Sequence, residues 1–226
     1  MNQTTFRKIA LGLLWLGFTI YAFGFAPPDQ PDTLDLIKRL STGQIEGINP
    51  LIVALFNIMG VLPVMYACFL YADGRGQRLP AWAFSAASFA VGAFALLPYL
   101  ALRQPNPSFV GKKNWLIKLL DSRLLGIGVA IATISLVTYG ITQGNWQEFV
   151  SQWQTSRFIH VMSLDFCLLC LLFPTLLGDD MARRGLKDSR IFWTVTFIPL
   201  FGTVIYLVLR PQLAEAVTTQ TTVVET

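Results

Sequence analysis

Three side chains inside the long apolar runs of this sequence are candidates for ligand or ion binding, and Asp165 is the one best suited to chemistry. It lies within the apolar run 158–178, where an ionised carboxylate in lipid costs about 3 kcal/mol or more. We therefore expect Asp165 to be protonated, to be paired with a cation or to face a watery cavity. A pair with Arg103, Arg123 or Arg157 would be structural, whereas a proton or cation site would be functional.

Asn57 and His160 are the other two candidates for ligand or ion binding. Asn57 can form an interhelical hydrogen bond, which favours helix packing over ligand binding. His160 could ligate the magnesium of a chlorophyll or the iron of a haem, or it could be hydrogen-bonded at a helix end. Because the sequence contains a single histidine, a site built from several histidines is excluded. The sequence predicts no metal site and identifies no cofactor.

The three cysteines give no sign of enzyme chemistry. Cys68, Cys167 and Cys170 lie within apolar runs and form no disulfide framework. In the middle of a helix, Cys167 and Cys170 cannot easily close a disulfide, and buried thiols behave as small apolar groups. Glycine-rich phosphate loops, zinc signatures and nucleophile elbows are missing from the sequence. We therefore predict a protein that is not an enzyme and has no catalytic residue.

The composition is that of a protein whose surface faces lipid. Apolar residues make up 54% of the 226 residues and charged residues only 13%, about half the charged fraction of a soluble domain. The mean hydropathy is +0.54. The net charge of +4 is modest, and the basic residues lie in loops between apolar runs. Their expected partners are the lipid bilayer and anionic head groups rather than nucleic acid.

The elements that must position the polar side chains are apolar runs of the length of membrane helices, about 20 residues each. They predict an all-α, polytopic helix bundle that forms a single membrane domain over residues 1–226. Pro27 argues against cleavage of the first run as a signal peptide, and the tail 211–226 is expected to be disordered. The six predicted membrane spans are 9–25, 51–72, 81–102, 124–141, 158–178 and 191–209.

Part of the chain is a weak internal repeat. A shift of 107 positions places Asp73–Arg103 on Asp180–Arg210 without a gap, and seven of the 31 pairs are identical, where chance would give roughly three. Six spans then divide as three plus three. Because each half has an odd number of spans, the halves would face opposite ways. Inverted repeats of this kind recur in transporters, but duplication also produces them in proteins that transport nothing.

Two matching Tyr-Leu-x-Leu-Arg segments end the repeated runs and carry Tyr99, Arg103, Tyr206 and Arg210. A tyrosine in the aromatic belt, followed by an arginine that extends toward head groups, is typical of lipid anchoring. We therefore interpret these four residues as structural or lipid-anchoring.

The basic loop 103–123 contains an apolar stripe that includes Trp115, with Lys112 and Lys113 beside it. This pattern predicts an interfacial helix on anionic lipid, or alternatively a solvated helix packed on the bundle. The charges give conflicting signals on orientation. In a six-span arrangement the first, third and fifth loops hold eleven Lys and Arg, and the termini and other loops hold six. This count places the N-terminus outside, whereas Arg7 and Lys8, beside an acidic first loop, indicate the reverse.

Two stretches resemble families of membrane proteins. The segments 25–28, 47–60 and 97–103 resemble a family of uncharacterised polytopic proteins of cyanobacteria and plastids. Separately, Asp165, the turn 180–184 and the terminal Leu207-Val-Leu-Arg210 resemble a short bacterial membrane family of unknown function, although that family has Glu where this chain has Asp179 and Asp180. The first resemblance implies a photosynthetic host and a thylakoid or plasma membrane. Neither implies an activity or a set of site residues.

The sequence leaves three functions open. The leading hypothesis is a non-enzymatic binding or scaffold protein within the bilayer, auxiliary to a membrane protein complex, and it is motivated by small residues at close-packing spacing. The second is a carrier of a small solute or an ion-coupled transporter that uses Asp165. The third is a membrane-embedded enzyme that modifies lipid.

Overall fold

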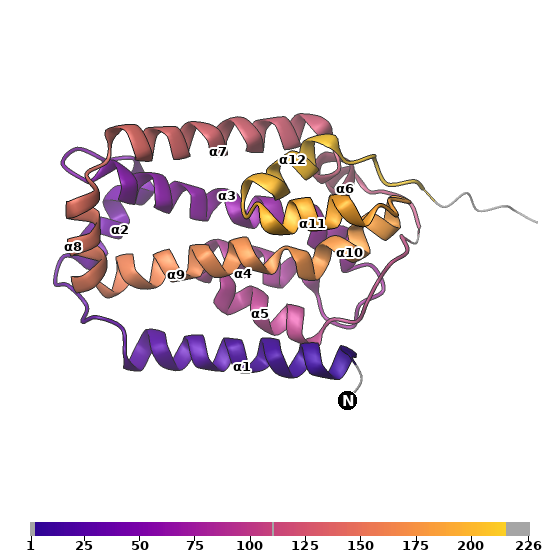
Figure 1. Ribbon diagram of the computed structural model, residues 1–226, viewed down its shortest axis with the longest axis horizontal. Coiled ribbons are helices and arrows are strands. Elements are labelled where there is room, and N and C mark those ends of the chain that lie inside the picture. The colour runs from indigo at the N-terminus through magenta and orange to yellow at the C-terminus, as the bar shows by residue number, and fades with distance from the viewer. Residues whose placement is uncertain (1–2, 110, 216–226) are drawn as a thin grey trace, which may run out of the picture.

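The structure, a computed structural model, describes residues 3–109 and 111–215, and within these ranges the chain forms helices and no strand. Figure 1 shows a bundle whose long helices run along one common direction. Two of them, α1 (Gln3–Gly24) and α7 (Arg123–Gln143), lie along opposite flanks. Between the flanks lie α3 (Pro50–Asp73) and the line formed by α9 (Arg157–Leu172) and α10 (Pro174–Arg183). The prediction of a helical bundle is confirmed.

Four helices in the described residues are long and apolar enough to cross a membrane: Thr4–Gly24, Pro50–Asp73, Arg123–Gln143 and Arg157–Arg183. The last joins α9 to α10 through Phe173, whose φ of −52° and ψ of −39° are helical. Pro174 interrupts the hydrogen-bond ladder there because proline has no N–H to donate. The helix α3 begins as its sequence predicts, with Pro50 at its first position and the Asn49 side chain accepting a 3.1 Å hydrogen bond from Leu51 N–H.

The predicted six-span arrangement is not confirmed, because residues 81–102 and 191–209 are not single helices. The first run forms α4 (Ala81–Val91) and α5 (Ala93–Leu102), and the second forms α11 (Ser189–Phe197) and α12 (Phe201–Leu209). Each of these helices has 9 to 11 residues, or a length of about 15 Å. That is roughly half of the ~30 Å hydrocarbon core of a bilayer.

Each pair of short helices forms a hairpin that returns to the end of the bundle where it started. Before α4, the Gln77 amide donates a 2.7 Å hydrogen bond to the carbonyl of Gln104, which follows α5, and accepts a 3.0 Å bond from Gln104 N–H. Before α11, Arg184 donates to the carbonyl of Pro211, which follows α12. We call α4–α5 the first hairpin and α11–α12 the second hairpin. Neither crosses the bundle.

The reversals occur at backbone conformations that a helix cannot contain. Gly92, between α4 and α5, has φ 50° and ψ −125°, a region that is open to glycine almost alone. Leu200, between α11 and α12, has φ 66° and ψ −67°. The N–H of Phe201 donates a 2.9 Å hydrogen bond to the Pro199 carbonyl across Leu200, which is the pattern of a γ-turn.

The helix α3 forms the centre of the core. Tyr66 on α3 is fully buried, donates a 2.6 Å hydrogen bond to the Leu169 carbonyl, and stacks on Phe173 with ring centroids 4.1 Å apart. Three shorter helices lie at the ends of the bundle (Figure 1): α2 (Thr33–Thr42) and α8 (Trp146–Thr155) at one end, and α6 (Trp115–Leu120) at the end that holds the hairpin loops.

The tail 211–226 was expected to be disordered, but the structure shows that its first residues are held by specific contacts. Leu213 is buried, its N–H donates a 2.9 Å hydrogen bond to Asp121, and its carbonyl accepts a 2.8 Å bond from Lys113. These contacts hold the start of the tail against the bundle. Residues 216–226 lie outside the described residues.

Candidate functional site

The carboxylate of Asp73 lies at the end of α3 and is bound by two side chains from the end of α5. Tyr99 donates a 2.7 Å hydrogen bond from its hydroxyl, and Arg103 donates a 2.8 Å bond from Nε and a second bond from Nη2. All three side chains are at most 1% exposed. The end of the first hairpin is therefore tied to the end of α3.

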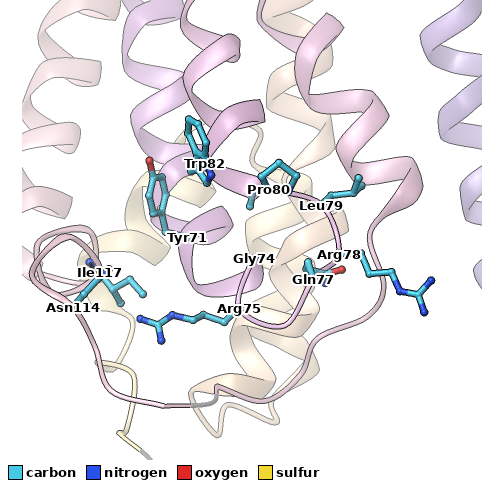
Figure 2. A pocket seen from close by; sticks show the side chains of 11 residues that line it. Tyr71, Gly74, Arg75, Gln77, Arg78, Leu79, Pro80, Trp82, Asn114 and Ile117 are labelled. Atoms are coloured by element: carbon cyan, nitrogen blue, oxygen red, sulfur yellow. Dashed lines mark hydrogen bonds between the residues drawn. The ribbon is translucent and has the colours of Figure 1, made fainter.

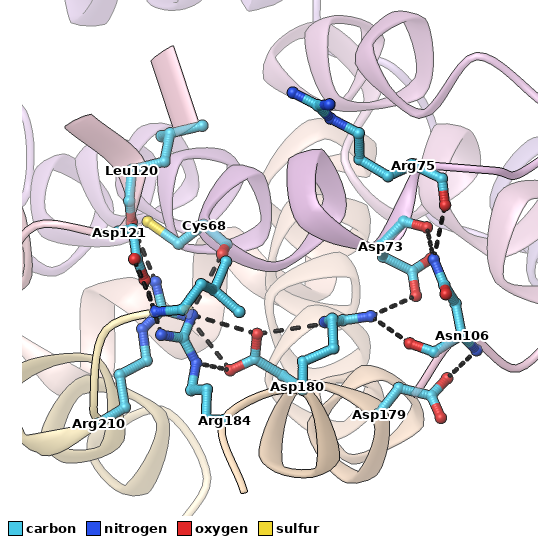
Figure 3. Close-up of polar contacts among 12 residues, drawn as sticks. Cys68, Asp73, Arg75, Asn106, Leu120, Asp121, Asp179, Asp180, Arg184 and Arg210 are labelled. Carbon is cyan, nitrogen blue, oxygen red and sulfur yellow. Dashed lines mark hydrogen bonds and ion pairs between the residues drawn. The ribbon is translucent and has the colours of Figure 1, made fainter. Parts of the chain in front are cut away.

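The carboxylate of Asp180 on α10 is bound in the same way by the second hairpin. Tyr206 donates a 2.8 Å hydrogen bond, and Arg210 donates a 3.3 Å bond from Nη1. Arg184 adds a 2.7 Å bond from Nε, as Figure 3 shows. Asp73 and Asp180 thus have a tyrosine 26 residues later and an arginine 30 residues later as partners.

Arg183 connects these two carboxylates. Its Nη1 lies 3.3 Å from Asp73 Oδ1, and its Nη2 lies 3.6 Å from Asp180 Oδ1. Two further ion pairs extend the contacts: Asp179 with Arg103, and Asp121 with Arg184 at 2.6 Å. We call the whole set the aspartate–arginine cluster. Its members are Asp73, Asp121, Asp179, Asp180, Arg103, Arg183, Arg184, Arg210, Tyr99 and Tyr206.

Within the aspartate–arginine cluster four carboxylates face four guanidinium groups, and Lys113, which pairs with Asp121 at 3.3 Å, adds one further positive charge. Burial alone would lower the pKa of Arg184, but hydrogen bonds to Asp180 and Asp121 and their negative charges raise it above its usual value. Burial also opposes the charge on Arg103, and Asp73 and Asp179 raise the pKa of that guanidinium. Arg103 and Arg184 therefore remain charged, and removing one of their partners would leave a buried charge uncompensated.

The structure differs from the expectation that the Tyr-Leu-x-Leu-Arg segments reach lipid. Tyr99, Arg103, Tyr206 and Arg210 are at most 4% exposed and bind carboxylates inside the protein. The physical reason is that Asp73 and Asp180 lie within reach, and a buried carboxylate needs a cationic partner. The sequence signal was available: the spacing from each aspartate to its tyrosine and arginine is the same in both halves.

Asp165 pairs with none of the arginines considered for it. Its Oδ1 accepts a 2.8 Å hydrogen bond from the N–H of Ala93, the first residue of α5, and the side chain is 6% exposed. The carboxylate also lies against Gly92, where a Cβ atom would overlap it. Asp165 therefore caps the start of α5 at the tip of the first hairpin. Arg157 instead pairs with Asp29 at 2.8 Å.

His160 is enclosed by hydrogen bonds and aromatic rings. Its Nε2 lies 2.8 Å from the Tyr21 hydroxyl and its Nδ1 lies 2.9 Å from the Trp153 carbonyl. Because a carbonyl can only accept, we assign the proton to Nδ1. The Trp153 ring lies 4.2 Å from the imidazole centroid. Both nitrogens are engaged, so neither is free to ligate a pigment metal, and this arrangement matches the hydrogen-bonded alternative.

Asn57 is exposed, and its amide donates a 2.8 Å hydrogen bond to the Val53 carbonyl of its own helix. It therefore joins no second helix. In the loop before α6, Trp115 is 75% exposed and Lys112 is exposed, as an interfacial position requires. Lys113 is instead half-buried and bound to Asp121 at 3.3 Å, so it points into the protein rather than toward lipid.

The described residues hold several clefts, and five of them, with volumes of about 370 to 560 Å³, are lined by none of Asp165, Asn57 and His160. Figure 2 shows a cleft of about 520 Å³ beside the loop before α4. Arg75 and Arg78 line this cleft, but their side chains point in opposite directions and do not converge on one ligand. Among the described residues, no group of three or more His, Cys, Asp or Glu is placed to hold a metal ion.

Comparison with known proteins adds no relative from which a function could be transferred. No family model, no curated protein and no solved structure matches this chain.

Proposed function

We propose that this protein is a non-enzymatic scaffold or binding protein of a membrane, built from two copies of one unit. Each unit would contain two spans followed by a half-membrane hairpin. Two sets of matching contacts support the duplication. Asp73 and Asp180 each bind the tyrosine 26 positions later, and Gln77 and Arg184 each bind the backbone carbonyl 27 positions later. Because each unit has two spans and a hairpin that returns, both units would face the same way. The axis relating them would then run along the membrane normal, in contrast to an inverted repeat.

One observation carries the scaffold proposal: the buried carboxylates and the single histidine are already bound within the protein. The Asp73 and Asp180 carboxylates bind arginine and tyrosine, Asp165 binds a backbone N–H, and His160 binds Tyr21 and a carbonyl. A carrier needs polar groups that can exchange protein partners for a solute. A scaffold needs instead a rigid bundle, and a buried cluster of ion pairs and hydrogen bonds supplies one.

The surfaces available to a partner are the two flanking helices. Only 17% of the apolar stretch of α1 and 22% of that of α7 is buried within the protein, compared with 56% of that of α3. Leu13 on α1 and Ile131 on α7 are 63% and 62% exposed. In a membrane these faces contact either lipid or another membrane protein, and we assign the partner of the scaffold to them.

The orientation follows from the hairpins. Of the 17 Lys and Arg in the chain, only Lys38, Arg39 and Arg157 lie at the end of the bundle that holds α2 and α8. With the other fourteen at the hairpin end, the positive-inside rule favours a cytoplasmic location for that end, where α1 begins and α12 ends. The six-span count gave conflicting signals because it treated each hairpin as a crossing. The resemblance to proteins of cyanobacteria and plastids extends the proposal to a thylakoid or plasma membrane.

The scaffold proposal is tested by gentle purification from the native membrane, followed by chemical crosslinking and mass spectrometry. We expect a partner in a fixed molar ratio, with crosslinks near α1 or α7. Leu13→Trp or Ile131→Trp should release it, whereas Leu34→Trp on α2, at a position that is 81% exposed, should not. A protein that purifies alone from its native membrane in every detergent tried would contradict the proposal.

A second candidate function, an ion-coupled carrier, is favoured by one observation. Asp165 lies at the tip of a half-membrane hairpin, and transporters place coupling ions beside interrupted helices of this kind. The discriminating experiment is proton flux in liposomes that contain the purified protein. A carrier predicts flux that Asp165→Asn abolishes, whereas a scaffold predicts no flux above that of empty liposomes.

A further inference from the structure

The two arms of the second hairpin line an open cleft. This cleft has a volume of about 410 Å³ and is lined by Ile191 and Val195 of α11 and by Ile205 and Leu209 of α12. Its lining is mainly apolar, and Tyr206 of the aspartate–arginine cluster forms part of its wall. In a membrane, such a cleft opens toward lipid, and its apolar lining favours the binding of an apolar group.

In the first hairpin, a larger side chain lies at the position that corresponds to Ile191. Phe84 on α4 is 107 positions before Ile191, is half-buried, and lies against Tyr99 with ring centroids 5.5 Å apart. Tyr99 in turn corresponds to Tyr206. Ile191 is shorter than phenylalanine, so the space between the arms of the second hairpin is left open.

A positive charge marks the mouth of the cleft. Arg190 lines it and is exposed, and Lys187 is exposed just before α11. Asp188 lies between them, with its carboxylate accepting a 2.8 Å hydrogen bond from the Arg190 N–H, so the mouth has a net positive charge. In the first hairpin the corresponding residues are Ala83 and Pro80, which carry no charge. The second hairpin therefore combines an apolar cleft with cations at its opening.

We propose that the cleft between α11 and α12 binds one acyl chain of an anionic phospholipid, with the phosphate of the same lipid at Arg190. The apolar lining accounts for the chain, and the exposed guanidinium accounts for the preference for negative charge. This proposal rests on the membrane placement of the proposed function, but not on the scaffold role. Resistance of the protein to carbonate extraction from membranes tests that placement separately.

The test is native mass spectrometry of the delipidated full-length protein in detergent, titrated with phosphatidylglycerol or phosphatidylcholine of identical acyl chains. We expect one high-affinity phosphatidylglycerol per protein. Ile191→Phe, which introduces the larger side chain that Phe84 provides in the first hairpin, should lower the affinity for both lipids at least tenfold. Arg190→Gln should lower only the affinity for phosphatidylglycerol, by about fivefold. Arg78→Gln, an exposed arginine before the first hairpin, is the matched control and should change neither.

Three results would overturn the proposal: equal affinity for the two lipids in the unaltered protein, unchanged binding by Ile191→Phe, or an equal loss in Arg78→Gln and Arg190→Gln. Thermal unfolding in detergent checks that each variant is folded. If Ile191→Phe does not fold, Ile205→Phe fills the same cleft from the opposite arm and decides the question by the same criterion. Ile191→Leu keeps the side-chain volume and should retain binding.

Discussion

The carboxylate of Asp165 accepts a 2.8 Å hydrogen bond from the backbone N–H of Ala93, the first residue of α5. The first N–H groups of any helix lack partners within the helix, and halfway through a membrane there is little water to bind them. A side chain from α9 therefore supplies the acceptor that the tip of the first hairpin needs. The same bond fixes the hairpin against the helix that carries Asp165.

Replacement of Asp165 separates the capping role from a role in ion transport. Asp165→Asn keeps an oxygen that can accept from Ala93, so we expect its stability in detergent to change by less than about 1 kcal/mol. Asp165→Leu leaves the N–H without an acceptor and should cost about 1–3 kcal/mol. The measurement is the thermal unfolding midpoint, and Cys167→Leu at an exposed position of α9 is the control. Equal losses in Asn and Leu variants would show that the negative charge, rather than the cap, is what matters.

Gly92→Ala should destabilise the first hairpin. The φ of 50° and ψ of −125° at Gly92 are strained for any L-residue, and the added Cβ would overlap the Asp165 carboxylate, so we expect a cost of at least about 1–3 kcal/mol. Gly60→Ala in α3 is the control, because a Cβ there meets nothing within 4 Å. Alanine at that helical position should stabilise the protein by about 0.5–1 kcal/mol. Opposite signs for the two substitutions in the unfolding midpoint are the expected result.

The helical segments could be predicted from the sequence. The reversal of the chain direction within the runs 81–102 and 191–209 could not. The run 81–102 is as apolar and as long as a true span, and hydropathy carries no information about direction. In the sequence, Gly92 is one of several small residues in that run. The reversal at Gly92 lies against the carboxylate of Asp165, 73 positions later, and single-sequence patterns do not identify such a contact.

The aspartate–arginine cluster was accessible only in part. The repeat aligns Asp73, Tyr99 and Arg103 with Asp180, Tyr206 and Arg210. It identifies these residues, but it does not show that each aspartate binds the tyrosine and arginine that follow it. Interpreted as spans, the two runs would separate each aspartate from its arginine by the thickness of a membrane. Only the hairpin arrangement brings residues 30 positions apart to the same end of the bundle.

The two tyrosines of the cluster should contribute equally to stability. Tyr99 and Tyr206 donate bonds of 2.7 and 2.8 Å to equivalent carboxylates, so Tyr99→Phe and Tyr206→Phe should each cost about 1.5–3 kcal/mol, as for hydrogen bonds to charged groups. Tyr139→Phe is the control, because its hydroxyl has no hydrogen bond within the described residues. Unfolding midpoints in detergent measure all three. A cost for only one of the pair would contradict equivalent roles.

Removal of a cluster carboxylate should cost more than removal of a tyrosine hydroxyl. Asp180→Ala leaves Arg184 and Arg210 without their shared buried partner, and we expect a loss of about 3–5 kcal/mol or failure to fold. Glu46→Ala, at an exposed position, should change stability by less than about 0.5 kcal/mol. Expression level and unfolding midpoint are measured together, so that failure to fold counts as the expected outcome. A stable Asp180→Ala variant would show that the cluster does not hold the second hairpin.

The hairpin arrangement makes a prediction about the two sides of the membrane. In a background in which the three native cysteines are alanine, single cysteines at Arg78 and Ser108 precede and follow the first hairpin, and one at Gln147 lies in α8. The structure places Arg78 and Ser108 at one end of the bundle and Gln147 at the other, because Gln77 and Gln104 are hydrogen-bonded to each other. A maleimide that cannot cross the membrane should therefore label the first two positions from the same side, and Gln147 from the opposite side.

A six-span chain would place Arg78 and Ser108 on different sides, so labelling of the two from different sides would refute the hairpin. A membrane-permeant maleimide should label all three and shows that each site is reactive.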